Sequence, residues 1–357
     1  MEICNYELHI MNYELKYMYR CLQLAQYGAG YVAPNPMVGA VLVCDDRIIG
    51  ESFHRHFGEL HAEPNAINSV KKAELLKSAT LYVNLEPCSH YGHTPPCADL
   101  IVKNAIPRVV IGTLDPNPKV AGRGVEILRK AGVELTVGVL EEECRELNKR
   151  FFIFQEKKRP YVLLKWAQTL DGFIDRKREN ATEKPLLISN AITSKLTHKM
   201  RSENQSILVG ANTVLLDNPT LTVRNWSGKS PVRVAIDRLG RIPENYNIVD
   251  GNIPTLVFTE DPKPDKPHVE YVKIDFELDK IQSILNEIYK RNIHSVLVEG
   301  GSQILTGFIQ SGLWDEANVE ISLQKIGDGV AAPVLPVQPI SRKLFDDHEW
   351  LFFKNSL

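Results

Sequence analysis

The chain has 357 residues, a formal net charge of −2 at pH 7, 43% hydrophobic residues and 24% charged residues. This composition is ordinary for a folded globular protein, and the length predicts two or three domains. Lys and Arg are spread along the chain, which disfavours a broad nucleic-acid-binding surface. No stretch approaches the roughly 18 uninterrupted apolar residues that a membrane span needs.

The N-terminal sequence and the cysteines predict a cytoplasmic protein. Residues 1–5 contain neither a basic segment nor an apolar one, so we expect no secretory signal. A long chain without such a signal is expected to keep its six cysteines reduced. The sequence Asn-Tyr-Glu-Leu occurs at 5–8 and again at 12–15. Two interpretations stay open: residues 1–10 are an extension before a true start at Met11, or the repeat arose by chance.

The first 154 residues predict a mixed sheet covered by helices. Apolar residues at three- and four-residue spacing predict a helix over 13–28. Apolar runs bounded by turn residues predict strands. The predicted elements follow the order helix-strand-strand-helix-strand-helix-strand-helix. This order indicates an α/β domain. The strands are expected at 38–43, 48–52, 79–85 and 109–112, and the later helices near His61, at 98–104 and at 124–130.

The composition changes at residues 154–160, a charged and proline-closed stretch that predicts a linker. We therefore expect one domain over residues 1–154 and a second α/β domain over residues 155–357. Strands of the second domain are expected at 161–165, 206–210, 232–236, 255–258 and 295–298, and its helices at 190–202 and 278–290.

One cluster of residue types predicts a catalytic metal. His61-Ala62-Glu63 is followed by Pro87-Cys88 and then by Cys97, with eight residues between the two cysteines. One imidazole and two thiolates with a fourth position open are typical of catalytic zinc. Zinc-dependent deaminases use a non-ligand carboxylate two residues after the His as the proton shuttle, and Glu63 stands at that position.

The chemistry of such a site follows from the metal. Coordination deprotonates both thiols, and zinc lowers the pKa of a bound water towards about 7. Glu63 is then expected to take that proton and pass it to the leaving amine. A structural zinc with His90 or His93 as the fourth ligand is the alternative, although both histidines also suit a loop that lines the substrate.

Several segments around these residues resemble the bifunctional riboflavin-biosynthesis deaminase/reductase family. The long loop between the two cysteines is typical of its deaminase half. Segments of the second half are similar to its reductase half, which has a dihydrofolate-reductase-like fold. The resemblance covers about residues 12–330 and is carried by segments 33–39, 58–63, 85–97 and 115–118 in the first half and 170–172, 208–214, 217–224 and 298–302 in the second.

The resemblance implies a zinc hydrolase joined to an NADPH-dependent oxidoreductase. Its substrate is a diaminopyrimidinone that carries a ribosylamino 5′-phosphate, which is first deaminated and then reduced to the ribityl compound. His61, Cys88 and Cys97 are implied to bind one zinc per chain, with Glu63 as the catalytic residue and Asn35 as a contact to the pyrimidine. A homodimer or homotetramer is implied as well, with no nucleic-acid or membrane partner.

The resemblance also assigns residues of the reductase half. Paired N–H donors of two arginines suit a phosphate, and a Gly-Gly pair before a helix lets backbone N–H groups approach a cofactor phosphate. In the deaminase half, the stretch 115–124 is a candidate phosphate or ribose contact. The implied cofactor contacts are Ala167, Ser189, Thr213, Asp217 and Gly301, and the implied substrate contacts are Arg201, Leu221, Arg224 and Glu299.

Two segments depart from the family pattern. Leu187-Ile188-Ser189 stands where the family often has Trp-Ile-Thr, so an aromatic cofactor contact is expected to be missing. The residues after Glu320 lack the usual Pro. The alternatives to this function are another nucleobase or tRNA deaminase, or a zinc-bearing scaffold with a non-catalytic C-terminal domain. The net charge disfavours the tRNA deaminase, and Glu63 disfavours the scaffold, because a structural site needs no spare carboxylate.

Overall fold

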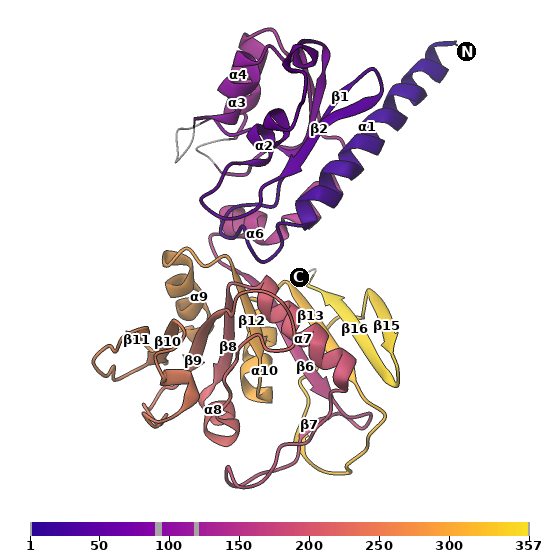
Figure 1. The fold of residues 1–357 in the computed structure, drawn as a ribbon. Helices are drawn as coiled ribbons and strands as arrows, with labels where there is room; N and C mark the ends of the chain where they lie inside the picture. Colours follow the sequence, from indigo (N-terminus) through magenta and orange to yellow (C-terminus); the bar gives the residue numbers. More distant parts are fainter. Residues whose placement is uncertain (1, 90–94, 118–120, 356–357) are drawn as a thin grey trace. The chain divides into compact units, whose positions relative to one another are not determined.

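The computed structural model describes residues 2–89, 95–117 and 121–355, with side chains from residue 13 onward. The chain forms two compact units, residues 1–157 and residues 158–357, called here the N-terminal and C-terminal units (Figure 1). Helix α6 (Lys149–Lys157) covers the first part of the stretch expected as a linker. That part is helical because Phe151, Phe152 and Phe154 are buried.

The N-terminal unit contains a five-stranded sheet in the order β2-β1-β3-β4-β5. Strand β1 is antiparallel to β2 and β3, while β3, β4 and β5 are parallel. The predicted elements are present, with η1, β5, α5 and α6 in addition. The strands are β1 (Gly39–Cys44), β2 (Arg47–Phe53), β3 (Thr80–Leu85), β4 (Arg108–Thr113) and β5 (Glu134–Val137); the helices are α1 (Glu2–Gln26), α2 (Ala62–Asn68), the 3₁₀ helix η1 (Ala73–Ser78), α3 (Cys97–Lys103), α4 (Arg123–Lys130) and α5 (Glu141–Leu147).

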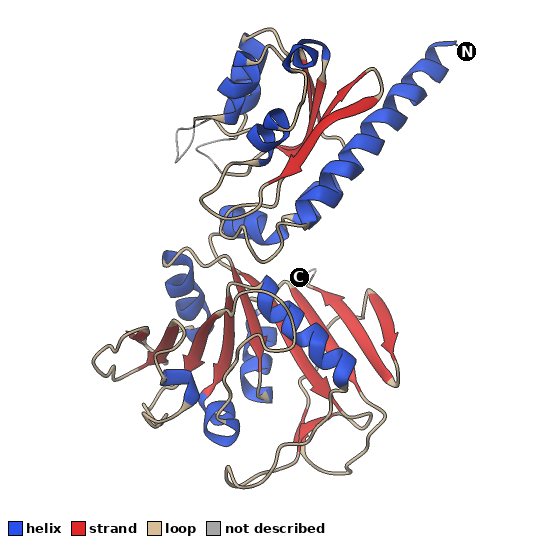
Figure 2. Ribbon diagram, viewed as in Figure 1, coloured by secondary structure: helices blue, strands red, loops and turns tan. Residues whose placement is uncertain are grey.

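Helices cover both faces of this sheet (Figure 2). Along β1, Ala40 and Leu42 join one apolar cluster with residues of α2, α3 and α4. Val41 and Val43 join another cluster with residues of α1. Because successive side chains of a strand point to opposite faces, the continuous apolar run of β1 is buried on both sides.

The C-terminal unit contains a nine-stranded sheet in the order β11-β10-β9-β8-β12-β6-β13-β16-β15. The seven strands from β11 to β13 are parallel, and β16 is antiparallel to β13 and β15. A two-stranded sheet pairs β14 with β7. The strands are β6 (Tyr161–Gln168), β7 (Phe173–Asp175), β8 (Ser206–Gly210), β9 (Val232–Ile236), β10 (Thr255–Thr259), β11 (Val269–Lys273), β12 (Ser295–Glu299), β13 (Glu316–Ile321), β14 (Val330–Ala331), β15 (Ser341–Phe345) and β16 (His348–Lys354).

Helices pack on both faces of the large sheet as well. Leu285 of α9 and Phe308 of α10 are buried in the apolar cluster of one face. Helix α7 crosses the other face, where Asn318 of β13 donates a hydrogen bond to Sδ of Met200 (Figure 1). The helices are α7 (Ala191–Glu203), α8 (Ala211–Asp217), the 3₁₀ helix η2 (Asn247–Val249), α9 (Lys280–Lys290) and α10 (Ser302–Ser311).

The predicted two-domain α/β architecture is confirmed. Because β6, β8, β9 and β12 are parallel neighbours, their carboxyl ends meet at one edge of the sheet, where ligands of such sheets bind. No helix in the described part of the chain combines the length and apolar character needed to cross a bilayer.

Candidate active sites

The three predicted zinc ligands lie together in the N-terminal unit. Nδ1 of His61 is 3.6 Å from Sγ of Cys88 and 3.4 Å from Sγ of Cys97, and the three ligand atoms lie within 4.8 Å of one another. A tetrahedral zinc ion with Zn–N and Zn–S bonds of about 2.1 and 2.3 Å separates N from S by roughly 3.6 Å. The donor types and their spacing therefore fit one zinc ion.

Each ligand is placed by a helix start or a strand end. His61 directly precedes α2, Cys97 is the first residue of α3, and Cys88 follows β3. The N–H of Cys97 donates to Sγ of Cys88 at 3.3 Å, and the N–H of Ala98 donates to the Cys88 carbonyl at 3.2 Å. Hydrogen bonds from Cys97 and His61 hold the pKa of Cys88 well below its usual range. The metal-binding thiolate is thereby favoured.

Glu63 lies in the first turn of α2 with only 3% of its surface exposed. Burial raises the pKa of Glu63 to about 7, and the negative charge of Cys88 adds to this effect. A carboxyl group with this pKa both accepts and releases a proton near neutral pH, as general acid–base catalysis requires. Among the described residues Glu63 is not part of the three-ligand cluster, so its carboxylate suits proton transfer.

Asn35 contacts His54, which in turn lies beside the cluster. His54 is buried, and its ring centre is 5.3 Å from that of His61. Burial lowers the pKa of His54 and favours its neutral form. Nδ1 of His54 is 3.1 Å from the Leu60 carbonyl, which can only accept, so Nδ1 carries the proton. Nε2 then accepts from Nδ2 of Asn35 at 3.1 Å. This bond fixes the orientation of the Asn35 amide.

Glu86 is a residue that the sequence did not single out. Its buried carboxylate accepts four backbone hydrogen bonds from the segment that leads into α4. The donors are the N–H groups of Asp115 (3.2 Å), Gly122 (3.0 Å), Gly124 (2.9 Å) and Val125 (3.2 Å). Because Glu86 lies two residues before Cys88, these bonds fix the chain that carries the first cysteine ligand. In the sequence, Glu86 is only an acidic residue within the segment Leu-Glu-Pro-Cys, and nothing there indicates its hydrogen-bond partners.

Some expectations fall outside the described residues. His90 and His93, the alternative fourth ligands, lie there, as do residues 118–120 of the candidate phosphate or ribose stretch. Within the described part of that stretch, burial raises the pKa of Asp115 to about 6, and the Asn117 N–H donates to its carboxylate at 2.7 Å.

The second site is a cavity of about 680 Å³ at the carboxyl ends of β6, β8, β9 and β12. A cavity of this size suits one small-molecule ligand. The five residues implied as cofactor contacts and the implied substrate contact Glu299 all line it. These cofactor residues are Ala167, Ser189, Thr213, Asp217 and Gly301.

The Gly300-Gly301 pair joins β12 to α10 in the cavity wall. Gly300 has φ of 133°, a backbone conformation that favours glycine. A Cβ at Gly300 would lie 3.2 Å from Oγ1 of Thr213, which accepts a hydrogen bond from the Gly301 N–H at 3.2 Å. The close approach of this turn to α8 leaves the first N–H groups of α10 at the cavity, where they suit a phosphate.

Asp217 is paired with a cation that the sequence did not reveal. Nη2 of Arg178 lies 2.6 Å from Oδ1 of Asp217, and Nε of Arg178 lies 2.8 Å from Oδ2 of Asp175. All three residues line the cavity. The two carboxylates therefore hold one guanidinium group in the wall.

Arg201, Leu221 and Arg224 do not line the cavity. Arg201 forms a bidentate ion pair with Glu299, at 2.9 and 2.6 Å, and Nη1 of Arg201 donates to the Thr222 carbonyl at 3.3 Å. Arg224 donates to the Thr222 hydroxyl at 3.3 Å, and Leu221 is buried. The two guanidinium groups thus meet at Thr222, and Arg201 is linked to the cavity through Glu299.

Burial and contacts define the surroundings of Lys165 and Asp171. Lys165 is buried and lines the cavity, so it is not a solvated strand residue. Asp171 accepts from the hydroxyl of Thr169 at 2.6 Å and from the N–H groups of Ile326 and Gly327 at 3.0 and 2.8 Å. Asp171 therefore fixes a loop by hydrogen bonds within the chain.

Family models match both units. Residues 11–113 match the cytidine and deoxycytidylate deaminase zinc-binding region, and residues 160–348 match the RibD C-terminal domain. The riboflavin biosynthesis protein RibD of Aquifex aeolicus is 41% identical over 343 residues, which cover 94% of each chain. The RibD protein of Escherichia coli is 34% identical over 355 residues, again covering 94% of each chain.

Solved structures share the fold over nearly the whole chain. The diaminohydroxyphosphoribosylaminopyrimidine deaminase/5-amino-6-(5-phosphoribosylamino)uracil reductase of Thermotoga maritima aligns with a TM-score of 0.88 and 40% identity, covering 97% of this chain and 100% of that one. RibD of Acinetobacter baumannii aligns with a TM-score of 0.87 and 30% identity, with the same coverage.

Proposed function

The chain belongs to the RibD family, and from that premise we propose how its residues carry out the family's two reactions. It is a bifunctional enzyme of riboflavin biosynthesis, with an N-terminal deaminase domain and a C-terminal reductase domain of dihydrofolate-reductase-like fold. The match over both units removes the alternatives of a tRNA deaminase and of a scaffold with a non-catalytic second domain. Its substrate is the diaminopyrimidinone with a ribosylamino 5′-phosphate.

The first reaction is a hydrolytic deamination in the N-terminal unit. Water adds to the ring carbon that bears the exocyclic amine, the C–N bond breaks, and ammonia leaves as the carbonyl forms. A zinc ion held by His61, Cys88 and Cys97 would favour hydroxide over water at neutral pH. Glu63 takes the proton from the water and delivers it to the leaving amine. Asn35, oriented by His54, presents its amide to the pyrimidine.

The second reaction is a reduction in the C-terminal unit. The bond between C1′ and the ring oxygen O4′ of the ribosyl group breaks, C1′ gains a hydride, O4′ gains a proton, and the open ribityl chain forms. A bound nicotinamide cofactor would supply the hydride. Gly301 and Thr213 provide the phosphate-binding turn, and Ala167, Ser189 and Asp217 contact the cofactor along the wall. Arg201, Arg224, Leu221 and Glu299 hold the phosphorylated substrate.

The preference for NADPH over NADH is supported by the cations at one end of the cavity. Arg238, Arg241 and Lys280 line the end formed by β9 and α9. Among the described lining residues, the carboxylates lie on other elements, namely β7, α8 and β12. Lys280 stands in the first turn of α9, where a cation opposes the helix dipole. Cations at this end suit the 2′-phosphate that distinguishes NADPH from NADH.

The proposal includes a cytoplasmic homodimer or homotetramer. The five described cysteines form no disulfide, which suits a reducing compartment. Strand β15 is an edge strand with Leu344 75% exposed, a surface suited to pairing with a second copy. Light scattering of the purified chain measures the mass, and a monomer at all concentrations contradicts this part of the proposal.

The observation that carries the proposed function is the cluster of His61, Cys88 and Cys97 beside the buried carboxyl group of Glu63. The direct test supplies the phosphorylated diaminopyrimidinone with NADPH and follows ammonia and NADPH oxidation together with the zinc content. We expect ammonia first and oxidation afterwards. Oxidation without ammonia contradicts the deaminase assignment, and ammonia without oxidation, when the deaminated compound is supplied, contradicts the reductase assignment.

A further inference from the structure

Glu320 of β13 is a fully buried carboxylate, 0% exposed, behind the wall of the reductase cavity. Its Oε2 accepts a hydrogen bond from Oγ of Ser189 at 2.7 Å and lies 3.6 Å from Nζ of Lys165. Ser189 and Lys165 both line the cavity, whereas Glu320 does not. A carboxylate removed from water is stabilised only through such partners, so these contacts fix its place.

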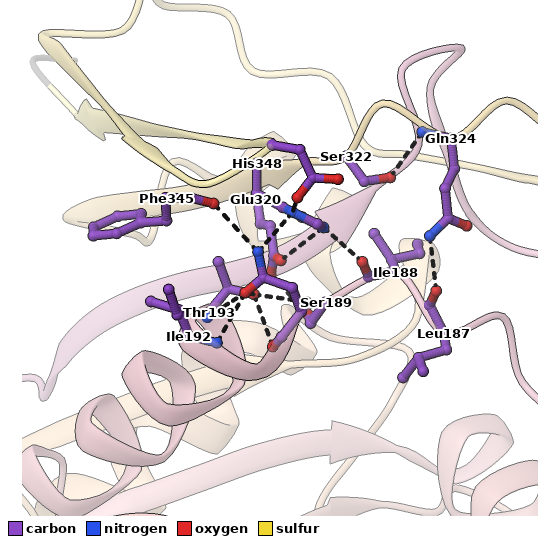
Figure 3. A network of polar contacts seen from close by, with 12 residues as sticks. Leu187, Ile188, Ser189, Ile192, Thr193, Glu320, Ser322, Gln324, Phe345 and His348 are labelled. Atoms are coloured by element: carbon purple, nitrogen blue, oxygen red, sulfur yellow. Dashed lines mark hydrogen bonds and ion pairs between the residues drawn. The ribbon is translucent and has the colours of Figure 1, made fainter.

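A third group approaches Glu320 from the neighbouring strand β16. Nε2 of His348 is 3.8 Å from Oε1 of Glu320 and 2.8 Å from the carbonyl oxygen of Ile188 (Figure 3). That carbonyl can only accept, so Nε2 carries a proton and donates it to the Ile188 carbonyl. His348 therefore ties the segment that carries Ser189 to the two strands behind it.

The two segments that depart from the family pattern meet at this network (Figure 3). Besides the bond between Ser189 and Glu320, Nε2 of Gln324 donates to the carbonyl of Leu187 at 3.0 Å. Leu187 itself lines the cavity with 80% of its surface exposed. Where the family often has an aromatic residue, this wall is held by polar contacts from the end of β13.

We propose that Glu320 is a positioning residue of the reductase site, which fixes the Ser189 hydroxyl and the Lys165 ammonium group in the cavity wall. This inference rests on the proposed reductase function of the cavity. Glu320 does not line the cavity, so it contacts neither the cofactor nor the substrate. It acts through Ser189 and Lys165, which line the cavity.

The hydrogen bond from Ser189 to Glu320 determines which kind of hydrogen bond the Ser189 hydroxyl can form with a ligand. A hydroxyl has one proton and two lone pairs. Because Ser189 donates its proton to Glu320, it offers only lone pairs to the cavity. Its partner on the ligand is then an N–H or O–H donor, such as the carboxamide of a nicotinamide ring.

The Lys165 contact determines where positive charge lies in the cavity. The ammonium group is 3.6 Å from Glu320 of β13 and also acts on the charge of Glu299 of β12, which lies in the wall with it. Lys165 is thus held between carboxylates from two strands. Loss of the Glu320 charge leaves Glu299 as the acidic neighbour and lets the ammonium group shift towards it.

The two contacts can be separated by kinetics. Glu320→Gln keeps the side-chain size and an oxygen acceptor for Ser189 but removes the charge beside Lys165. We expect kcat of reduction to fall about tenfold or more, with KM for NADPH changed less than about threefold. Ser189→Ala removes the hydroxyl. We expect it to raise the Kd of NADPH, measured by titration without substrate, about fivefold, with kcat little changed.

A double-mutant cycle tests whether Glu320 acts through Lys165. If it does, Glu320→Gln has little further effect on kcat in a Lys165→Met background, because the partner is already gone. Equal effects of Glu320→Gln with and without Lys165 overturn the inference. Ammonia release by the same variants should match that of the unchanged chain.

Asp315→Asn is the matched control for a merely structural role. Asp315 is a buried carboxylate directly before β13, paired with Arg159 at 2.6 Å. Its loss should lower the melting temperature but leave both kinetic constants of the folded protein unchanged. If Glu320→Gln behaves in the same way, the inference is wrong. If the unchanged chain binds neither NADPH nor NADH in the titration, the proposed function fails and this inference with it.

Discussion

The metal cluster and the reductase cavity collect their residues over very different lengths of chain. His61, Glu63, Cys88 and Cys97 come from one segment of 61–97, brought together by the end of β3 and the starts of two helices. The cavity wall extends from Lys165 to Val330 and includes residues from four neighbouring parallel strands. The cluster therefore depends on local chain geometry, whereas the cavity depends on the order of strands in the sheet.

The largest expected effect concerns the cluster alone. Glu63→Gln removes the group that transfers protons, so we expect ammonia release to fall about 10³-fold. Zinc content should stay near one per chain, because Glu63 is not among the three ligand residues. Reduction of the deaminated compound should be unchanged. Ammonia release at the original rate contradicts the shuttle role, and simultaneous loss of zinc assigns the defect to metal binding instead.

The next effect concerns the cavity alone. Arg224→Ala removes a guanidinium group next to Arg201 at Thr222, so we expect kcat/KM of reduction to fall about ten- to hundredfold. Deamination should continue at its usual rate. The control is Arg342→Ala on β15, whose side chain is 78% exposed. If both activities fell together in folded protein, the separation of the two sites would be contradicted.

A smaller effect sharpens the comparison within the cavity. Lys280→Gln removes a cation from the end assigned to the 2′-phosphate, so we expect Kd for NADPH to rise about five- to tenfold. Kd for NADH should not change. Lys290→Gln, at the other end of α9, makes the same charge change and should leave both constants unaltered. A parallel rise for NADPH and NADH would show that Lys280 does not distinguish them.

A separate effect concerns stability and not activity: the pH dependence of unfolding of the C-terminal unit. Burial lowers the pKa of His294 from 6.5 to about 4. Between these values the unfolded chain binds more protons than the folded one, so the contribution of His294 is present above about pH 6.5 and is lost as the pH falls towards 4. The loss amounts to at most about 3 kcal/mol. Unfolding of the unchanged chain and of His294→Gln, compared at pH 7 and pH 4.5, should show the smaller acid loss for the variant.

The cluster of His61, Cys88 and Cys97 could be predicted from the sequence because the three residues lie within one short segment of the chain. Glu86 could not be predicted, since its partners are backbone N–H groups of residues 115–125, far along the chain. Arg178 was missed for the same reason: its ion pair with Asp217 joins a loop to the end of α8. The burial of Lys165 could not be predicted either, because it depends on the position of β6 between β12 and β13 in the sheet.

The same limit applies to the fold. Continuous apolar runs such as residues 206–210 predicted the central strands, since these are buried on both faces. Strand β13 alternates polar and apolar residues, and β15 is largely exposed, so neither has a strong apolar run. Residues 154–157 were expected in a linker because of their charges, but the buried ring of Phe154 belongs to the end of a helix.

The Glu86 carboxylate has a consequence for how the chain acquires its metal. Four backbone N–H groups of residues 115–125 bind the side chain that stands two residues before Cys88. The ordering entropy of this ligand-bearing segment is thus lost during folding, before the ion arrives. A zinc ion would then bind to side chains that are already ordered, and its apparent affinity would be higher, because binding would no longer have to oppose this loss of entropy. Glu86, which is not part of the three-residue cluster, would thereby contribute to metal affinity.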